Sequence, residues 1–243
     1  CLIATTTVNL AWSSSESDLD RYSVTCELSG SACSGFSFAS TTATSTSYAL
    51  PSDDSSYTFK AKAIDKSGNA GSQQTKTVEF FTRPIVINEI AWAGTATSSF
   101  DEWIELHNRT SKAVSLSGWV LYSLTDEKPY LELSGTIASG GYYLIERTDN
   151  ETVSDIAADL VASFGSGAGQ GLVNAGEVLI LSQASTTIDE TPSACTGWCA
   201  GSATGFLTME RIEPDVSGTE SSNWGSHNGT VKNGKDAGGA ALA

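Results

Sequence analysis

Ile87-Asn88-Glu89-Ile90, followed by Asp101-Glu102-Trp103-Ile104-Glu105-Leu106-His107-Asn108 and Leu116-Ser117-Gly118-Trp119, decides the fold of this chain. In the second block, Ile104 and Leu106 alternate with Trp103, Glu105 and His107. A period of two is typical of a β-strand that buries one face and turns the other outward. The third block leads into another strand through a tight turn. These blocks predict a fold built from short strands.

The three blocks, in this order and spacing, resemble the start of a lamin tail domain. The resemblance extends over about residues 85–231, because Asn174–Leu181, Met209-Glu210-Arg211 and Asn223-Trp224 also have counterparts in lamin tail domains of bacterial secreted and surface proteins. It implies an immunoglobulin-like β-sandwich with a binding or structural role and no chemistry of its own. The cysteine-bearing insertion 193–205 departs from the pattern.

About residues 5–82 resemble a fibronectin type III domain. Trp12, Tyr22, the pair Leu50-Pro51 with Tyr57, and the turn Asp65–Asn69 carry this resemblance. It implies a second sandwich, with Tyr57 in a tyrosine corner. Almost nothing precedes the strand of Trp12, so we expect the first strand to be short or missing.

The predicted fold class is therefore all-β, with two tandem immunoglobulin-like β-sandwiches. We expect domains at 1–82 and 85–231, a stiff Arg83-Pro84 linker at 83–84, and a flexible, glycine- and alanine-rich tail at 232–243. One short helix is expected at Asp155–Phe164, where Ile156, Leu160 and Val161 fall near one face.

The composition of the chain limits its possible partners and its location. The formal net charge is -15, from 13 basic and 28 acidic residues, and such a field repels phosphate backbones, so nucleic acid is excluded as a default partner. No apolar run reaches the ~18 residues that a transmembrane segment needs. The chain opens on Cys1 without a signal sequence, so we read it as a processed or excised piece of something longer, and lipidation of Cys1 stays open. We expect a secreted or cell-surface protein from a bacterium.

Four of the five cysteines form two close pairs, Cys26 with Cys33 and Cys195 with Cys199. We predict two short-loop disulfides, which indicate an oxidising compartment. The alternative, a four-cysteine zinc site, is disfavoured because the spacings are not those of C-x₂-C pairs and the two pairs lie far apart in sequence.

No catalytic residues are predicted. The two histidines, His107 and His227, lie in a strand motif and in a glycine-rich tail, and neither is near a serine elbow. The acidic group of Glu89, Asp101, Glu102 and Glu105 is read as structural, with Glu89 and Glu105 tying down loops through hydrogen bonds to backbone N–H groups; a carboxylate pair or metal site is the alternative. The glycine-rich loop 165–171 lacks the lysine of a phosphate-binding loop.

No cofactor is expected. Loop residues with side-chain oxygens leave a calcium site open, although they lack the EF-hand pattern. These residues are Asp149, Asn150, Glu151, Asp155, Asp159, Asp215 and Glu220.

The outward residues Trp103, Glu105 and His107 form the predicted binding surface. With Trp92, Trp198 and Trp224, Trp103 is also a candidate for stacking on sugars, and the alternative is that a neighbouring loop covers it. We therefore expect protein partners or self-assembly, with carbohydrate as a further option.

The predicted function is a non-enzymatic secreted or cell-surface module for structure or adhesion, mediating protein–protein assembly. Strand addition to an incomplete first sandwich would make filaments if it ran head to tail. The alternative is a pair of accessory domains, binding carbohydrate or a surface, in a larger secreted hydrolase.

Overall fold

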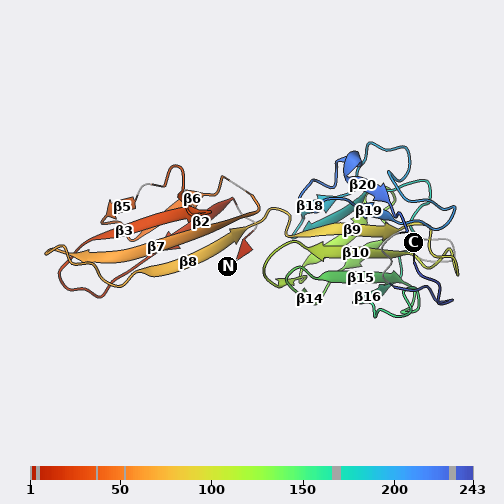
Figure 1. Cartoon of the computed structure of the whole chain (residues 1–243), viewed down its shortest axis with the longest axis horizontal. Coiled ribbons are helices and arrows are strands. Elements are labelled where there is room, and N and C mark those ends of the chain that lie inside the picture. Colours follow the sequence, from red (N-terminus) through yellow and green to blue (C-terminus); the bar gives the residue numbers. More distant parts are fainter. Residues whose placement is uncertain are drawn as a thin grey trace. The chain divides into compact units, whose positions relative to one another are not determined.

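The computed structural model describes residues 2–3, 6–36, 38–51, 53–165, 171–229 and 234–242. The chain forms two compact units, Cys1–Thr82 and Arg83–Ala243, and strands dominate both (Figure 1). Within the described residues there is no α-helix; the one helical turn is the 3-10 turn η1 (Ser221–Asn223). The fold class is all-β with immunoglobulin-like sandwich architecture, as predicted.

The first unit contains a large sheet and a small one. The large sheet has the order β1-β8-β7-β3-β4 with β5 also beside β3, and the small sheet pairs β2 with β6. The strands are β1 (Leu2–Ile3), β2 (Thr7–Ala11), β3 (Leu19–Leu28), β4 (Ser31–Ala32), β5 (Phe38–Thr41), β6 (Ser45–Ala49), β7 (Ser55–Asp65) and β8 (Gln74–Phe80).

Alternation along the strands builds the core of the first unit. Tyr57 and Phe59 of β7 point inward, and in the sheet register they sit opposite Val78 of β8 and Cys26 of β3, all four buried. Burying each such side chain contributes about 1.5 to 3 kcal/mol. Trp12 is only half-buried, although its indole N–H donates to the Ala43 carbonyl at 2.8 Å.

The expected short first strand is β1. It pairs in parallel with β8, through Leu2 opposite Glu79 and Ile3 opposite Phe80. It does not extend the small sheet, and among the described residues no strand pairs with the outer edge of β2. This leaves Trp12 and its neighbours uncovered on that side.

The second unit contains three sheets. Their orders are β16-β15-β10-β9-β19-β20, β13-β12-β17-β18 and β11-β14. The strands are β9 (Ile85–Ala91), β10 (Trp103–Asn108), β11 (Val114–Ser115), β12 (Trp119–Ser123), β13 (Tyr130–Glu132), β14 (Thr136–Ile137), β15 (Tyr142–Arg147), β16 (Leu160–Ala162), β17 (Leu179–Gln183), β18 (Thr186–Glu190), β19 (Met209–Arg211) and β20 (Trp224–Ser226).

The core of the second unit lies between its two larger sheets. Ile104 and Leu106 of β10 and Leu121 and Leu181 of the four-stranded sheet are completely buried. Trp103, Glu105 and His107 alternate with them and therefore face away from this core.

One buried ion pair ties the two sheets together. Arg211 of β19 contacts Asp189 of β18, and both side chains are almost fully buried. The Arg211 Nε–H donates to the Ile87 carbonyl at 2.7 Å, and the Asp189 carboxylate accepts the Ile87 N–H at 2.9 Å. These hydrogen bonds offset part of the cost of burying the two charges. They also fix how β9, β18 and β19 meet.

The helix expected at Asp155–Phe164 is wrong: its end is the strand β16, which pairs in parallel with β15. Short polar side chains form hydrogen bonds with backbone groups here, in place of the hydrogen bonds of a helix. Asn150 accepts the Ala158 N–H at 2.7 Å, and the Asp159 carboxylate accepts the Leu144 N–H at 2.9 Å. The Asp159 N–H donates to the Leu144 carbonyl, which turns the chain onto the edge of the sheet.

Residues 234–242 fall in the segment expected to be a flexible tail. They make ordered contacts within the second unit: the Ser154 N–H donates to the Lys235 carbonyl at 2.7 Å, and Asp155 accepts the Lys235 N–H at 2.7 Å. Asp236 is buried and accepts the Ala240 N–H. The chain end therefore packs on the protein surface over this stretch.

Candidate binding site

The outer face of the six-stranded sheet in the second unit carries a groove of about 590 Å³. The central strands of this sheet are β15, β10, β9 and β19, which run side by side in Figure 1. Trp103 and Glu105, two of the three predicted surface residues, line it. The segment around Ile156 and the chain end at Leu242 form its other walls.

Three glutamates form a row across the floor of this groove. In the sheet register, Glu105 of β10 lies opposite Glu89 of β9, and Glu89 lies opposite Glu210 of β19. Residues directly opposite each other in antiparallel strands project from the same face at short range. We call this set, Glu105, Glu89 and Glu210, the glutamate row.

The glutamate row contacts neutral or weakly basic side chains. Glu105 accepts a hydrogen bond from the Asn88 amide at 2.8 Å, and Glu89 accepts one from the Thr208 hydroxyl at 2.6 Å. A Glu210 oxygen lies 3.6 Å from Nε2 of His227. Among the described lining residues there is no lysine or arginine.

Burial changes the acidity of this row. Loss of water contact raises the pKa of Glu89 to about 8, and the charges of Glu210 and Glu105 act in the same direction, whereas the Thr208 hydroxyl lowers it. Burial likewise raises the pKa of Glu105. The row therefore accepts hydrogen bonds at neutral pH without carrying its full negative charge.

Trp103 faces the predicted way but is only 6% exposed. It packs in a small apolar cluster with Ala91, Leu144 and Val153, and Leu242 of the chain end lies against that cluster. The alternative interpretation, that a neighbouring segment covers Trp103, is therefore correct. Its indole N–H has no hydrogen-bond partner within the described part of the chain.

His107, the third predicted surface residue, stacks on Tyr142 with ring centroids 4.7 Å apart. Burial and the nearby Arg109 lower the pKa of His107, so its imidazole is neutral at pH 7. Tyr142 is 56% exposed and lines the groove. The open aromatic ring at this site is therefore Tyr142, which the sequence did not single out.

Four of the aspartates left open for calcium bind backbone N–H groups or an arginine. Asp149 accepts the Glu151 N–H, Asp155 and Asp159 cap backbone groups, and Asp215 pairs with Arg109. Over the described ranges, no three histidine, cysteine, aspartate or glutamate side chains are placed to hold a metal ion. Glu102 is buried against Arg147 at 3.0 Å and accepts the Leu172 N–H, the structural role expected for it.

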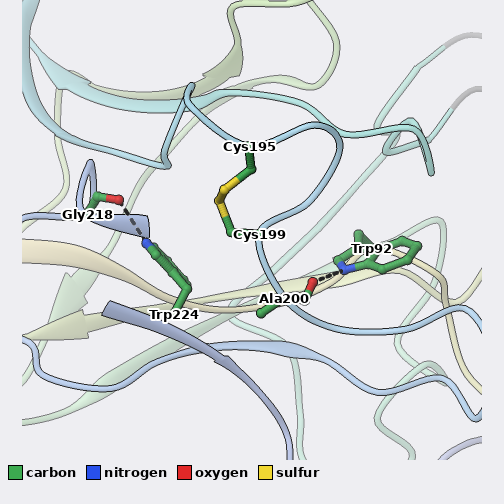
Figure 2. Close-up of a disulfide and its surroundings, with 6 residues drawn as sticks. All are labelled: Trp92, Cys195, Cys199, Ala200, Gly218 and Trp224. Atoms are coloured by element: carbon green, nitrogen blue, oxygen red, sulfur yellow. Dashed lines mark hydrogen bonds between the residues drawn. A yellow bond between two sulfur atoms is a disulfide. The ribbon is translucent and has the colours of Figure 1, made fainter. Parts of the chain in front are cut away.

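Both disulfides lie between the predicted pairs, Cys26–Cys33 and Cys195–Cys199. Figure 2 shows the second one closing a loop beside two tryptophans. The Trp92 indole donates to the Ala200 carbonyl at 3.0 Å, directly after the loop.

The remaining tryptophans of the predicted sugar-stacking set are also engaged. Trp198, inside the disulfide loop, stacks on Trp92 and donates to the Val173 carbonyl at 2.9 Å. Trp224 donates to the Gly218 carbonyl at 2.8 Å (Figure 2). The guanidinium of Arg211 lies over the Trp224 ring. Trp92 and Trp224 are buried, so the prediction that they are exposed is wrong. Trp92 holds the disulfide loop in place through Trp198 and Ala200.

A second candidate surface lies in the first unit. A groove of about 680 Å³ is lined by β2, which pairs with β6 alone among the described strands. Leu10 and Trp12 line one side, and Phe59, Ala61 and Ala63 of β7 line the other. It exposes part of the sandwich interior.

No described helix has the length and apolar character that crossing a bilayer requires.

Comparison with known proteins identifies one family. A family model described as Lamin Tail Domain matches residues 81–238. No curated protein matches the chain. Among solved structures, a DUF4876 family protein from Bacteroides thetaiotaomicron is similar at 10% identity, with a TM-score of 0.41, over 93% of this chain and 92% of that chain. Residues before 81 lie outside the family match, so their fibronectin type III resemblance stays a prediction.

Proposed function

Because this chain belongs to the lamin tail domain family, we propose that it is a non-enzymatic module that acts outside the cell or at its surface and assembles with protein partners. An immunoglobulin-like sandwich supports this proposal, since such folds present edges and faces for contact. The two disulfides support an oxidising location. Structure or adhesion is the proposed role.

The open edge of β2 is the observation that carries the proposal. The Trp12 N–H bonds to the Thr44 carbonyl and the Leu50 N–H to the Thr6 carbonyl, which fixes the phase of the β2–β6 ladder. Antiparallel ladders alternate, so the backbone groups of Asn9 and Ala11 point to the outer edge. Unpaired N–H and C=O groups in a row are a template for another strand.

The groove beside this edge supports the same function. A strand added to β2 would place alternate side chains over Leu10, Trp12 and Phe59, where the sandwich interior is open. Main-chain hydrogen bonds would provide affinity, and the apolar groove would select the side chains.

A strand from a second copy would make the assembly head to tail. Such a contact joins two different surfaces, so it does not close and it grows into a filament. Residues 234–242 make contacts within their own unit, and deleting 228–243 therefore tests whether the chain end supplies the strand.

Ala11→Pro tests the assembly proposal. Proline removes the outward N–H of Ala11 without breaking a bond to β6, so it blocks strand addition. Light scattering after size-exclusion chromatography should give oligomers that grow with concentration for the unaltered chain and a monomer for Ala11→Pro. The matched control is Ser45→Pro, which alters the other edge of the same small sheet and should leave the oligomers intact. A monomer at every concentration for the unaltered chain would overturn the proposal.

A second candidate function is an accessory domain pair that binds carbohydrate for a larger secreted hydrolase. The observation in its favour is the exposed Tyr142 ring beside the carboxylates of the groove. Affinity electrophoresis in gels containing soluble polysaccharides tests it. Retardation that Tyr142→Ala abolishes would favour this candidate, whereas unchanged mobility in every gel would remove it.

A further inference from the structure

We propose that the groove over the glutamate row binds a basic side chain, a lysine ammonium or an arginine guanidinium, carried by an extended segment of a partner protein. The site lies in the second unit and does not depend on the open edge of β2. It therefore goes beyond the proposed function.

The glutamate row supplies the charge complementarity. Glu105 and Glu210 lie on either side of Glu89 in the register of β10, β9 and β19, and carboxylates set side by side on one face of a sheet repel one another. Among the described residues that line the groove, only His227 approaches the row with a basic group. A cation seated between Glu105 and Glu210 would remove this repulsion and form charge-assisted hydrogen bonds.

Trp103 gives a second, independent indication of a ligand. It lines the same groove, more than nine-tenths of it is buried, and its indole N–H has no partner in the described residues. A buried donor without an acceptor is costly. A peptide carbonyl that follows the basic side chain into the groove would satisfy it, after the chain end at Leu242 moves aside.

The walls of the groove fit an amino-acid side chain better than a bare metal ion. Leu144 and Ile156 offer apolar surface to the methylene stem of a lysine or arginine. The open ring of Tyr142 faces the groove and is a place for a cation to rest. Within the described chain no set of three metal-ligating side chains is in place here.

Isothermal titration of the full chain tests the site. The probe is a capped pentapeptide with lysine at its centre and valine at the other positions, at low salt. The comparison peptide carries norleucine in place of lysine. We expect heat of binding only for the lysine peptide. Glu105→Gln and Glu210→Gln should each weaken its affinity about tenfold, as one charge-assisted hydrogen bond predicts.

Glu213→Gln is the matched control, because Glu213 is exposed and close to β19 in sequence and this variant removes the same charge. It should leave the affinity unchanged, which separates the groove from general attraction to an acidic protein. Trp103→Phe keeps the ring packing and should weaken the lysine peptide without changing the unfolding temperature by more than a few degrees.

Four outcomes would overturn the proposal: no heat with the lysine peptide, equal heat with the norleucine peptide, equal weakening by Glu213→Gln, or calcium chloride alone binding in a manner that the same glutamine variants abolish. None of these outcomes bears on the oligomers tested with Ala11→Pro, so the two proposals fail separately.

Discussion

The carboxyl group of Glu89 is held between two other glutamates and away from water, with its pKa raised to about 8. In the unfolded chain the same group titrates near 4.5. Between these values the unfolded state releases a proton that the folded state keeps. The contribution of Glu89 to the free energy of unfolding is therefore fully present below pH 4.5 and is lost as the pH rises towards 8.

Glu89→Gln should remove this loss. We expect the variant to be more stable than the unaltered chain at pH 8 by up to about 4 kcal/mol, and nearly equal to it at pH 4.5. Urea unfolding of both proteins at the two pH values measures the difference. Glu213→Gln, at an exposed position, is the control. A benefit that is the same at both pH values would contradict the pKa shift as its cause.

Asn108 ends the block that decides the fold, and it is completely buried. Its amide N–H groups contact the carbonyls of Lys112, Ile137 and Ala138, and its oxygen accepts the Thr110 N–H. Asn108→Ala leaves these groups unsatisfied, so it should cost about 2 to 4 kcal/mol of unfolding free energy. The exposed Asn174→Ala is the comparison in urea unfolding, and similar losses for both would contradict this role.

Single residues show where sequence reasoning stops. The period of two along β10 gave the directions of Trp103, Glu105 and His107 correctly. It did not reveal that Leu242, far along the chain, lies against the cluster of Trp103. Nor did it join Glu89 to Glu210, because that contact depends on the register between β9 and β19. Local patterns carry no information on such pairings.

Elements were predictable where apolar and polar residues alternate strictly. Most of β7 and the central part of β10 follow this pattern, and each is a strand. The stretch 155–164 mixes both periods over a few residues, and hydrogen bonds from Asn150 and Asp159 decide its conformation. Short apolar runs with polar neighbours are the cases in which helix and strand cannot be told apart from sequence.

The disulfide loop Cys195–Cys199 is an element whose removal has a local effect. Cys195→Ala with Cys199→Ala should cost about 2 kcal/mol in the loop-entropy picture. We expect a clearer effect on tryptophan fluorescence, because the Trp92–Trp198 stack loosens and the emission maximum then shifts to longer wavelength. The matched control is the double replacement of Cys26 and Cys33. If that pair shifts the emission equally, the loop does not hold the stack.

The net charge of the whole molecule predicts that it does not bind nucleic acids. A net charge of -15 provides few basic groups to release counterions from a nucleic acid. Fluorescence anisotropy at about 150 mM salt should show no binding to labelled DNA or RNA. Micromolar affinity that weakens with salt would contradict this expectation.

The whole chain should also be catalytically inert. Screens with esterase, phosphatase, peptidase, nuclease and glycosidase substrates should give background rates only. His107 is neutral and stacked on Tyr142, which is a structural setting. Turnover that His107→Ala abolishes would overturn this prediction.

The parallel pairing of β1 with β8 has a mechanical consequence. Tension applied across the first unit pulls the start of β1 and the end of β8 in opposite directions. Parallel neighbours loaded in this way are sheared, so their hydrogen bonds bear the force together instead of opening in turn. Because only Leu2 opposite Glu79 and Ile3 opposite Phe80 join them, this clamp is short. Under load β1 detaches first, while β3, β7 and β8 keep their long ladders, and the edge of β8 is then uncovered by stretching alone.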